Sequence, residues 1–64
     1  MWAEIKKVHT LTLAEMWKLY FEGEGIPARI MPEAGEKLGR ELGDYTILVP
    51  EDRIHVAREV EGKL

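Results

Sequence analysis

The joint between a helical pattern and a strand pattern at residues 24–27 constrains the fold of this chain more than any other feature. Gly23 and Gly25 are expected to end the helix, because glycine adopts the left-handed conformation that closes a helix without steric cost. Residues 26–31 then alternate in the manner of a half-buried strand. Pro27 lacks an N–H, so this strand is expected at a sheet edge, or Pro27 lies ahead of the pairing.

The helix that precedes the joint is predicted over residues 13–22. Thr12, followed three residues later by Glu15, matches the capping-box pattern and predicts that Thr12 is the N-cap. A helix this short cannot bury every large residue against three strands, so we expect Tyr20 or Met16 to be partly exposed. The large side chains with i, i+3, i+4 spacing are expected to form the apolar stripe: Leu13, Met16, Trp17, Tyr20 and Phe21.

Two further strands are predicted, one at residues 3–10 and one at residues 45–49, because both segments are rich in β-branched residues. Ile5 and Val8 would point to opposite faces of a regular strand. Either both faces of the first strand are partly covered, or a β-bulge shifts its register. The sequence does not decide between these alternatives.

The C-terminal segment predicts a second helix, opened by Pro50 and two acidic residues that favour a helix N-terminus. Its apolar stripe consists of Ile54, Ala57, Val60 and Leu64. Residues 32–44, between the second and third strands, are too many for a tight hairpin turn. Charge pairs at i, i+4 spacing favour a loop with a helical turn there, although Gly35 and Gly39 each weaken a helix by roughly 1 kcal/mol.

These elements predict a single α+β domain over residues 1–64 with the order βαββα. A right-handed crossover makes the first two strands parallel and leaves room for one strand between them. The third strand fits that gap, which gives a three-stranded antiparallel sheet in the order 1-3-2 with both helices on one face. This is a truncated ferredoxin-like plait, and its first strand exposes an unpaired outer edge.

Composition excludes several classes of function. Without cysteine the chain has no disulfide, thiolate nucleophile or zinc-thiolate site. A net charge of −3 argues against nucleic acid as a partner, and no apolar run approaches the roughly 20 residues that span a bilayer. The charged N-terminal segment predicts no signal peptide and a cytoplasmic protein. The absence of Ser, Asn and Gln beside 33% charged residues favours a thermophilic source.

The residues that could carry catalysis have other expected roles. Thr10 and Thr46 belong to predicted strands, and no serine or cysteine is available as a nucleophile. His9 and His55 lie on different elements without the spacing of a metal site. The glycines of the 32–44 loop lack the spacing of a phosphate-binding loop. We therefore predict no enzymatic activity, no metal and no cofactor.

The open edge of the first strand is the predicted partner or dimer surface, formed by Trp2, Ile5 and Tyr45. Exposed aromatic residues concentrate at interfaces, although Trp2 and Tyr45 could equally cap the ends of the core. The prediction is a small interaction or regulatory domain that self-associates or docks on a protein through this edge. The alternative is a sensor of an unidentified small ligand that uses the 32–44 loop and an intersubunit cleft.

Several short segments also resemble a known family. They are Ala14-Glu15, Phe21-Glu22, Gly25-Ile26-Pro27-Ala28, and Ile47-Leu48-Val49-Pro50-Glu51-Asp52 with Ala57. With this pattern the chain resembles the putative prokaryotic signal-transducing proteins, a family of unknown specific function. The resemblance implies a compact βαββα domain similar to half of a PII-type regulator. It implies no catalytic or ligand-binding residue.

Overall fold

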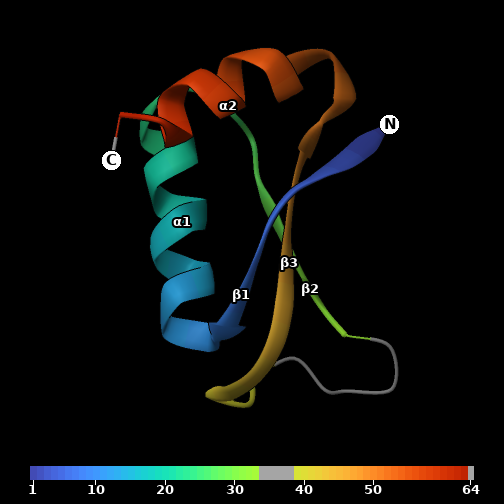
Figure 1. The fold of residues 1–64 in the computed structure, drawn as a ribbon, viewed down its shortest axis with the longest axis vertical. Coiled ribbons are helices and arrows are strands. Elements are labelled where there is room, and N and C mark those ends of the chain that lie inside the picture. The colour runs from blue at the N-terminus through green and yellow to red at the C-terminus, as the bar shows by residue number, and fades with distance from the viewer. Residues whose placement is uncertain (34–38, 64) are drawn as a thin grey trace.

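The computed structural model describes residues 1–33 and 39–63, which form one βαββα unit (Figure 1). In chain order the elements are β1 (Trp2–Thr10), α1 (Leu11–Gly23), β2 (Arg29–Pro32), β3 (Leu42–Pro50), the 3-10 turn η1 (Glu51–Arg53) and α2 (Ile54–Glu61). The strands form an antiparallel sheet in the order β1-β3-β2. The predicted α+β fold and strand order are confirmed.

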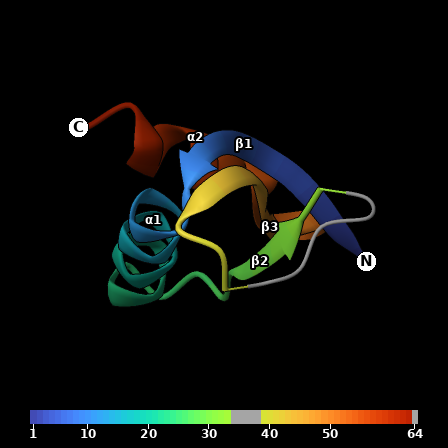
Figure 2. The same cartoon turned by 90° about the horizontal axis from the view of Figure 1, so that it is seen from below.

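The two helices form a layer on one side of the sheet. α1 contacts all three strands, and α2 lies across the end of the same layer, where it contacts β1 and β3 (Figures 1 and 2). Ala14 and Ala57 are fully buried, and their small side chains let each helix approach the sheet closely. Among the described elements, no helix covers the opposite face of the sheet.

A β-bulge in β1 decides between the two alternatives left open by the sequence. Glu4 pairs with Leu48 and Lys6 pairs with Ile47, so Ile5 is an extra residue on β1. Such an insertion shifts the alternation of side chains by one position. Ile5 and Val8 are consequently both buried under the helices.

The N-cap of α1 is Thr10, and the prediction of Thr12 was wrong. Thr10 has extended backbone angles as the last residue of β1, and its Oγ1 accepts a hydrogen bond from the Leu13 N–H at 3.1 Å. The Leu11 N–H donates to the Glu41 carbonyl at 2.8 Å. Because the chain leaves the sheet directly into the helix, α1 begins at Leu11, and Thr12 lies within the first turn.

The joint after α1 has the hydrogen bonds of a Schellman motif. The Ile26 N–H donates to the Phe21 carbonyl at 2.9 Å, and the Gly25 N–H donates to the Glu22 carbonyl at 3.0 Å. Gly25 has a φ of +83°, the left-handed conformation that this motif requires. Phe21 and Ile26 are both fully buried, so the turn also fixes one side of the core.

The largest fully buried side chains come from the joint and from β3: Tyr45, Phe21, Ile26, Ile47 and Val49. The Tyr45 hydroxyl donates to the Arg40 carbonyl, so its polar end is satisfied just outside the core.

β2 starts only at Arg29, although Ile26 and Ala28 ahead of it are buried. The predicted helical turn in the 32–44 loop falls largely on residues 34–38, which lie outside the described residues.

Replacement of the two neighbouring threonines tests the position of the cap. We expect Thr10→Ala to lower the free energy of unfolding by about 1 kcal/mol, because the Leu13 N–H loses its acceptor. Thr12→Ala removes only an exposed hydrogen bond to Glu41 and should cost less than about 0.5 kcal/mol. Urea denaturation followed by circular dichroism measures both values. A larger loss for Thr12→Ala would contradict this assignment.

Candidate interaction surfaces

Among the strands that the structure describes, none pairs with the outer edge of β1. Several features of β1 oppose pairing with another strand. The bulge at Ile5 interrupts its hydrogen-bonding pattern, Lys6 points inward toward the helices, and Lys7 and His9 are exposed charged or polar residues. Bulges, edge lysines and inward-pointing charges are known devices that protect sheet edges. The edge is open but poorly suited to strand addition.

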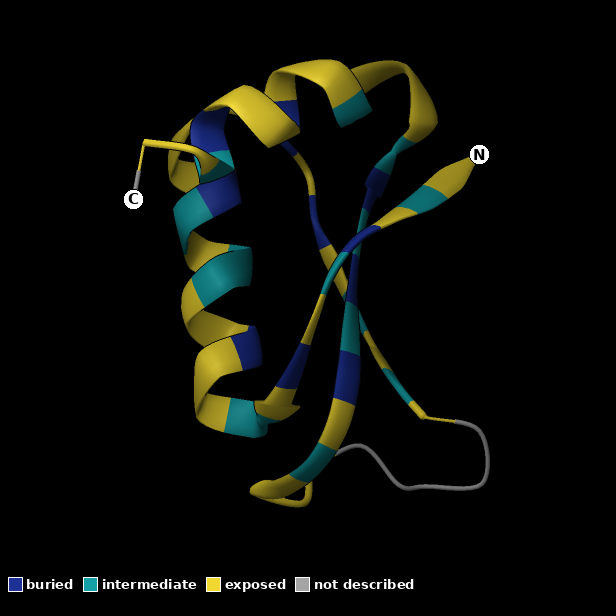
Figure 3. Ribbon diagram, viewed as in Figure 1, coloured by how far each residue is buried: buried dark blue, intermediate teal, exposed yellow. Residues whose placement is uncertain are grey.

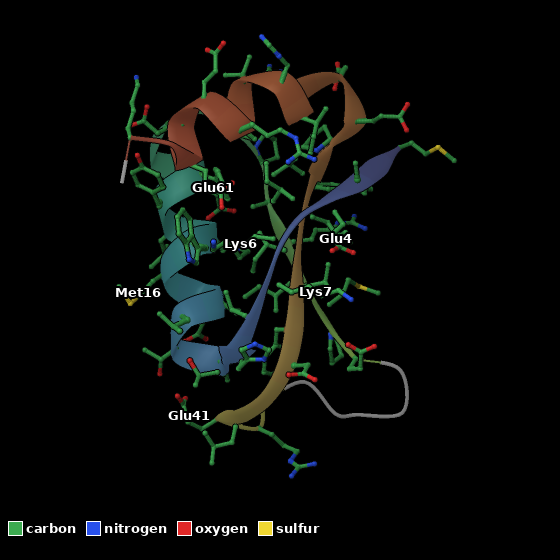
Figure 4. All side chains as sticks on the ribbon, in the orientation of Figure 1. Glu4, Lys6, Lys7, Met16, Glu41 and Glu61 are labelled. Carbon is green, nitrogen blue, oxygen red and sulfur yellow. The ribbon has the colours of Figure 1, made fainter. Side chains whose placement is uncertain are left out.

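Lys6 connects β1 to both helices. Its Nζ lies 2.9 Å from Glu61 Oε2 and 4.7 Å from the centroid of the Trp17 ring. Figure 4 shows Lys6 and Glu61 pointing toward each other in the space between α1 and β1. Both side chains are only partly exposed, so Lys6 is held inward by an ion pair and by a cation–π contact. The aliphatic stem of Lys6 also covers core that would otherwise be open at this edge.

A shallow apolar groove runs along α1 beside this lysine. It is lined by the four residues that we call the α1 flank: Leu13, Met16, Trp17 and Tyr20. Leu13 is 44% exposed and Met16 is 59% exposed. Trp17 and Tyr20 are partly buried and pack edge to face, with ring centroids 5.8 Å apart. Figure 4 shows Met16 directed away from the sheet.

The α1 flank corrects the predicted apolar stripe. The residues of α1 that are fully buried are Ala14 and Phe21, which lie seven positions apart on one side of the helix. The expected partial exposure of Tyr20 or Met16 is confirmed for both residues, and Leu13 is exposed as well. Figure 3 shows the exposed side of α1 turned away from the sheet. The predicted stripe therefore contains a buried side and an exposed apolar side.

The Tyr20 hydroxyl fixes the end of the α1 flank by donating to the Val60 carbonyl at 3.0 Å. This bond joins α1 to the last turn of α2, at a carbonyl that also accepts from the Lys63 N–H at 3.2 Å. Trp17 is held in turn by Tyr20, by Phe21 and by the Lys6 ammonium. The aromatic floor of the groove is thus fixed from three sides, whereas Leu13 and Met16 form its adaptable outer part.

A second surface is the sheet face that the helices leave uncovered. On this face Glu4, Leu48 and Arg29 form one row across the three strands, and Lys7, Thr46 and Met31 form the next. The Arg29 guanidinium lies 4.4 Å from the centroid of the Trp2 ring, although the two residues belong to opposite edge strands. Their side chains therefore meet across β3.

The three residues predicted for the partner surface do not form one exposed surface. Trp2 is 37% exposed and lies on the uncovered sheet face, whereas Ile5 is 8% exposed and Tyr45 is 1% exposed. The bulge turns Ile5 into the core, and the register of β3 places Tyr45 opposite Val8 under α1. Of the three residues, Trp2 alone therefore has an exposed side chain in this chain, and a partner surface at these positions stays a prediction.

The two histidines lie apart, each beside its own carboxylate. His9 Nδ1 is 2.7 Å from Asp44 Oδ1, and His55 Nε2 is 3.2 Å from Glu59 Oε1. All four side chains are largely exposed. Within residues 1–33 and 39–63, no three His, Asp or Glu residues are grouped as a metal site requires. None of the described helices is long and apolar enough to cross a membrane.

The groove nearest to the 32–44 loop lies between α1 and β2. It is open, and its lining combines apolar and charged residues: Leu11, Glu15, Lys18, Arg29, Ile30 and Gly39. The ligand-sensor alternative depends on the part of the loop at residues 34–38, which lies outside the described residues. It stays a prediction.

No protein-family model matches the chain, and comparisons with curated proteins and with solved structures found no match either. The resemblance to putative signal-transducing proteins gains no support from these comparisons and stays a prediction.

Replacement of the inward-pointing lysine tests whether it protects the edge of β1. Lys6→Val removes the charge from the core side of the strand and leaves Glu61 without its partner. We expect faster aggregation on heating, measured by light scattering, because an uncharged edge pairs more readily with other chains.

Lys18→Val is the matched control, since it also breaks one ion pair, with Glu22, but lies on α1 away from the edge. Its aggregation rate should remain close to that of the wild type. Equal acceleration in both variants would show that Lys6 has no special role at the edge.

Proposed function

We propose that this chain is a non-enzymatic protein-interaction domain that docks a partner along its β1–α1 side. The observation that carries the proposal is the exposure of Leu13 and Met16 over a fixed Trp17–Tyr20 floor, directly beside the open edge of β1. Large apolar side chains gathered at one exposed site, rather than scattered, indicate a binding surface. This supports docking beside the predicted edge and mainly on helix α1.

The properties of the edge favour side-chain packing over strand addition. A partner strand would meet the bulge at Ile5 and the charges of Lys6 and Lys7. The α1 flank has no such obstacle, because its lining is almost entirely apolar. The partner therefore packs apolar side chains onto α1, and the β1 edge contributes its charged rim.

An amphipathic helix of another protein is the partner that fits this surface. Leu13, Met16, Trp17 and Tyr20 follow i, i+3, i+4, i+7 spacing, so they present about two turns of helix, roughly 10 Å, to whatever binds. Aromatic residues supply rigid contact area, and methionine adapts to the shape of the partner. The Lys6–Glu61 pair lies at the margin, where it can orient polar residues of the partner.

We further propose a regulatory or signal-transducing role in the cytoplasm, which the segment resemblance and the composition support.

Charge introduced into the groove should abolish docking without unfolding the domain. Met16→Glu places a carboxylate on the α1 flank, and Val56→Glu places one on another exposed apolar site, on α2. Both should change the free energy of unfolding by less than about 0.5 kcal/mol. Quantitative mass spectrometry compares the proteins captured by wild type and by each variant.

A protein retained by wild type and by Val56→Glu but lost with Met16→Glu is then purified and titrated by calorimetry. We expect at least a roughly 10-fold weaker Kd for Met16→Glu, as for a central apolar contact of an interface. Purified partners that bind Met16→Glu and wild type equally well would overturn the proposal.

A further inference from the structure

The uncovered face of the sheet has a row of side chains with opposite charges at its two ends. Glu4 on β1, Leu48 on β3 and Arg29 on β2 are cross-strand neighbours, so an acid, an apolar residue and a base lie side by side. Figure 4 shows Glu4 and Lys7 on the side of β1 away from α1. Neither Glu4 nor Arg29 forms an ion pair with any residue that the structure describes.

We propose that this face binds the same face of a second copy of the chain, with Glu4 of each copy paired to Arg29 of the other. The two-fold axis runs parallel to β3 and passes between the two Leu48 side chains. Rotation about this axis exchanges the β1 side for the β2 side, so each acid meets a base. Two sheets packed face to face lie about 10 Å apart, which long charged side chains bridge at the rim.

The Arg29 side chain is held over the uncovered face by Trp2. Its guanidinium stacks on the Trp2 ring at 4.4 Å, which occupies a face of the planar group, and its N–H donors lie at the edge of that plane. A carboxylate accepts two of these donors at once. Trp2, 37% exposed, would lose its remaining accessible surface against the partner. In this dimer Trp2, which was predicted at a dimer surface, packs against the sheet face of the second copy.

The order of charges along the row, acid on β1 and base on β2, favours a second copy of the chain as the partner and allows it only one orientation. A two-fold axis perpendicular to β3 in the interface would place Glu4 against Glu4 and Arg29 against Arg29, which is unfavourable. Only the parallel axis satisfies both pairs. A stable interface buries about 800 Å² on each partner, about a fifth of the 4320 Å² that this chain exposes. An interface of this area requires a whole face of the sheet, because the edge of β1 alone is too small.

This inference does not rest on docking at the α1 flank, which lies on the opposite side of the sheet. Self-association is measured by sedimentation equilibrium of the full chain over a range of concentrations, without any other partner. Met16→Glu should dimerise like the wild type. A failure of either proposal therefore leaves the other intact.

Charge reversal and charge exchange test the pairing. We expect the wild type to dimerise and Glu4→Arg or Arg29→Glu each to weaken the dimer roughly 100-fold, because every reversal places two like-charged pairs in the interface. The Glu4→Arg/Arg29→Glu double variant restores opposite charges and should regain most of the lost affinity. Glu24→Arg, an equal reversal at the exposed end of α1, should have no effect.

Three outcomes would overturn the inference. One is a wild type that stays monomeric at every concentration. Another is a dimer that neither single reversal weakens, and the third is a double variant no tighter than the single ones. Circular dichroism of each variant verifies the fold, and because Glu4 and Arg29 are both exposed, each reversal should leave it intact.

Discussion

The rest of the structure depends on the hydrogen bond from the Ile26 N–H to the Phe21 carbonyl, because it sets the direction in which the chain leaves α1. It ends α1, turns the backbone through Gly25 and buries both of its own residues in the core. Because the turn is so short, β2 must start near the end of α1 and run parallel to β1. The gap between β1 and β2 then admits only β3, antiparallel to both. The open edge of β1 and the uncovered sheet face both follow from this arrangement.

Element order and strand topology could be predicted because they depend on local signals: a glycine stop, alternating strands and a handed crossover. The residues whose cap role or burial differs from the prediction depend on contacts between distant segments. Thr10 is the cap because the Leu11 N–H is satisfied by the Glu41 carbonyl, a partner about thirty residues away in sequence that no local motif identifies. Tyr45 is buried because the register of β3 places it opposite Val8. Register is set by the packed sheet as a whole.

The exposed apolar side of α1 shows a different limit of sequence reasoning. Apolar residues surround more than half of this helix, so i, i+3, i+4 spacing fits several faces equally well. The sheet selects the side on which Ala14 allows the closest approach and Phe21 fills the core. Burial of that side leaves Leu13 and Met16 in solvent. The small side chain of Ala14 among large ones could have identified the buried side of α1 from the sequence, since a helix that packs tightly on a sheet needs small residues at the contact.

The unpaired edge of β1 in the described sheet lies between two surfaces that differ in chemistry. An edge without a partner must be protected, and the bulge with inward-pointing Lys6 performs this at β1. Exposed apolar contact area lies instead on the two neighbouring surfaces. On α1 it gathers as an almost purely apolar groove, which suits a partner of variable shape. On the sheet it alternates with Glu4 and Arg29, whose opposite signs permit only a partner with a matching order of charges. The proposed sheet-face dimer thus requires a specific order of charges, whereas the proposed docking on α1 requires an adaptable apolar contact.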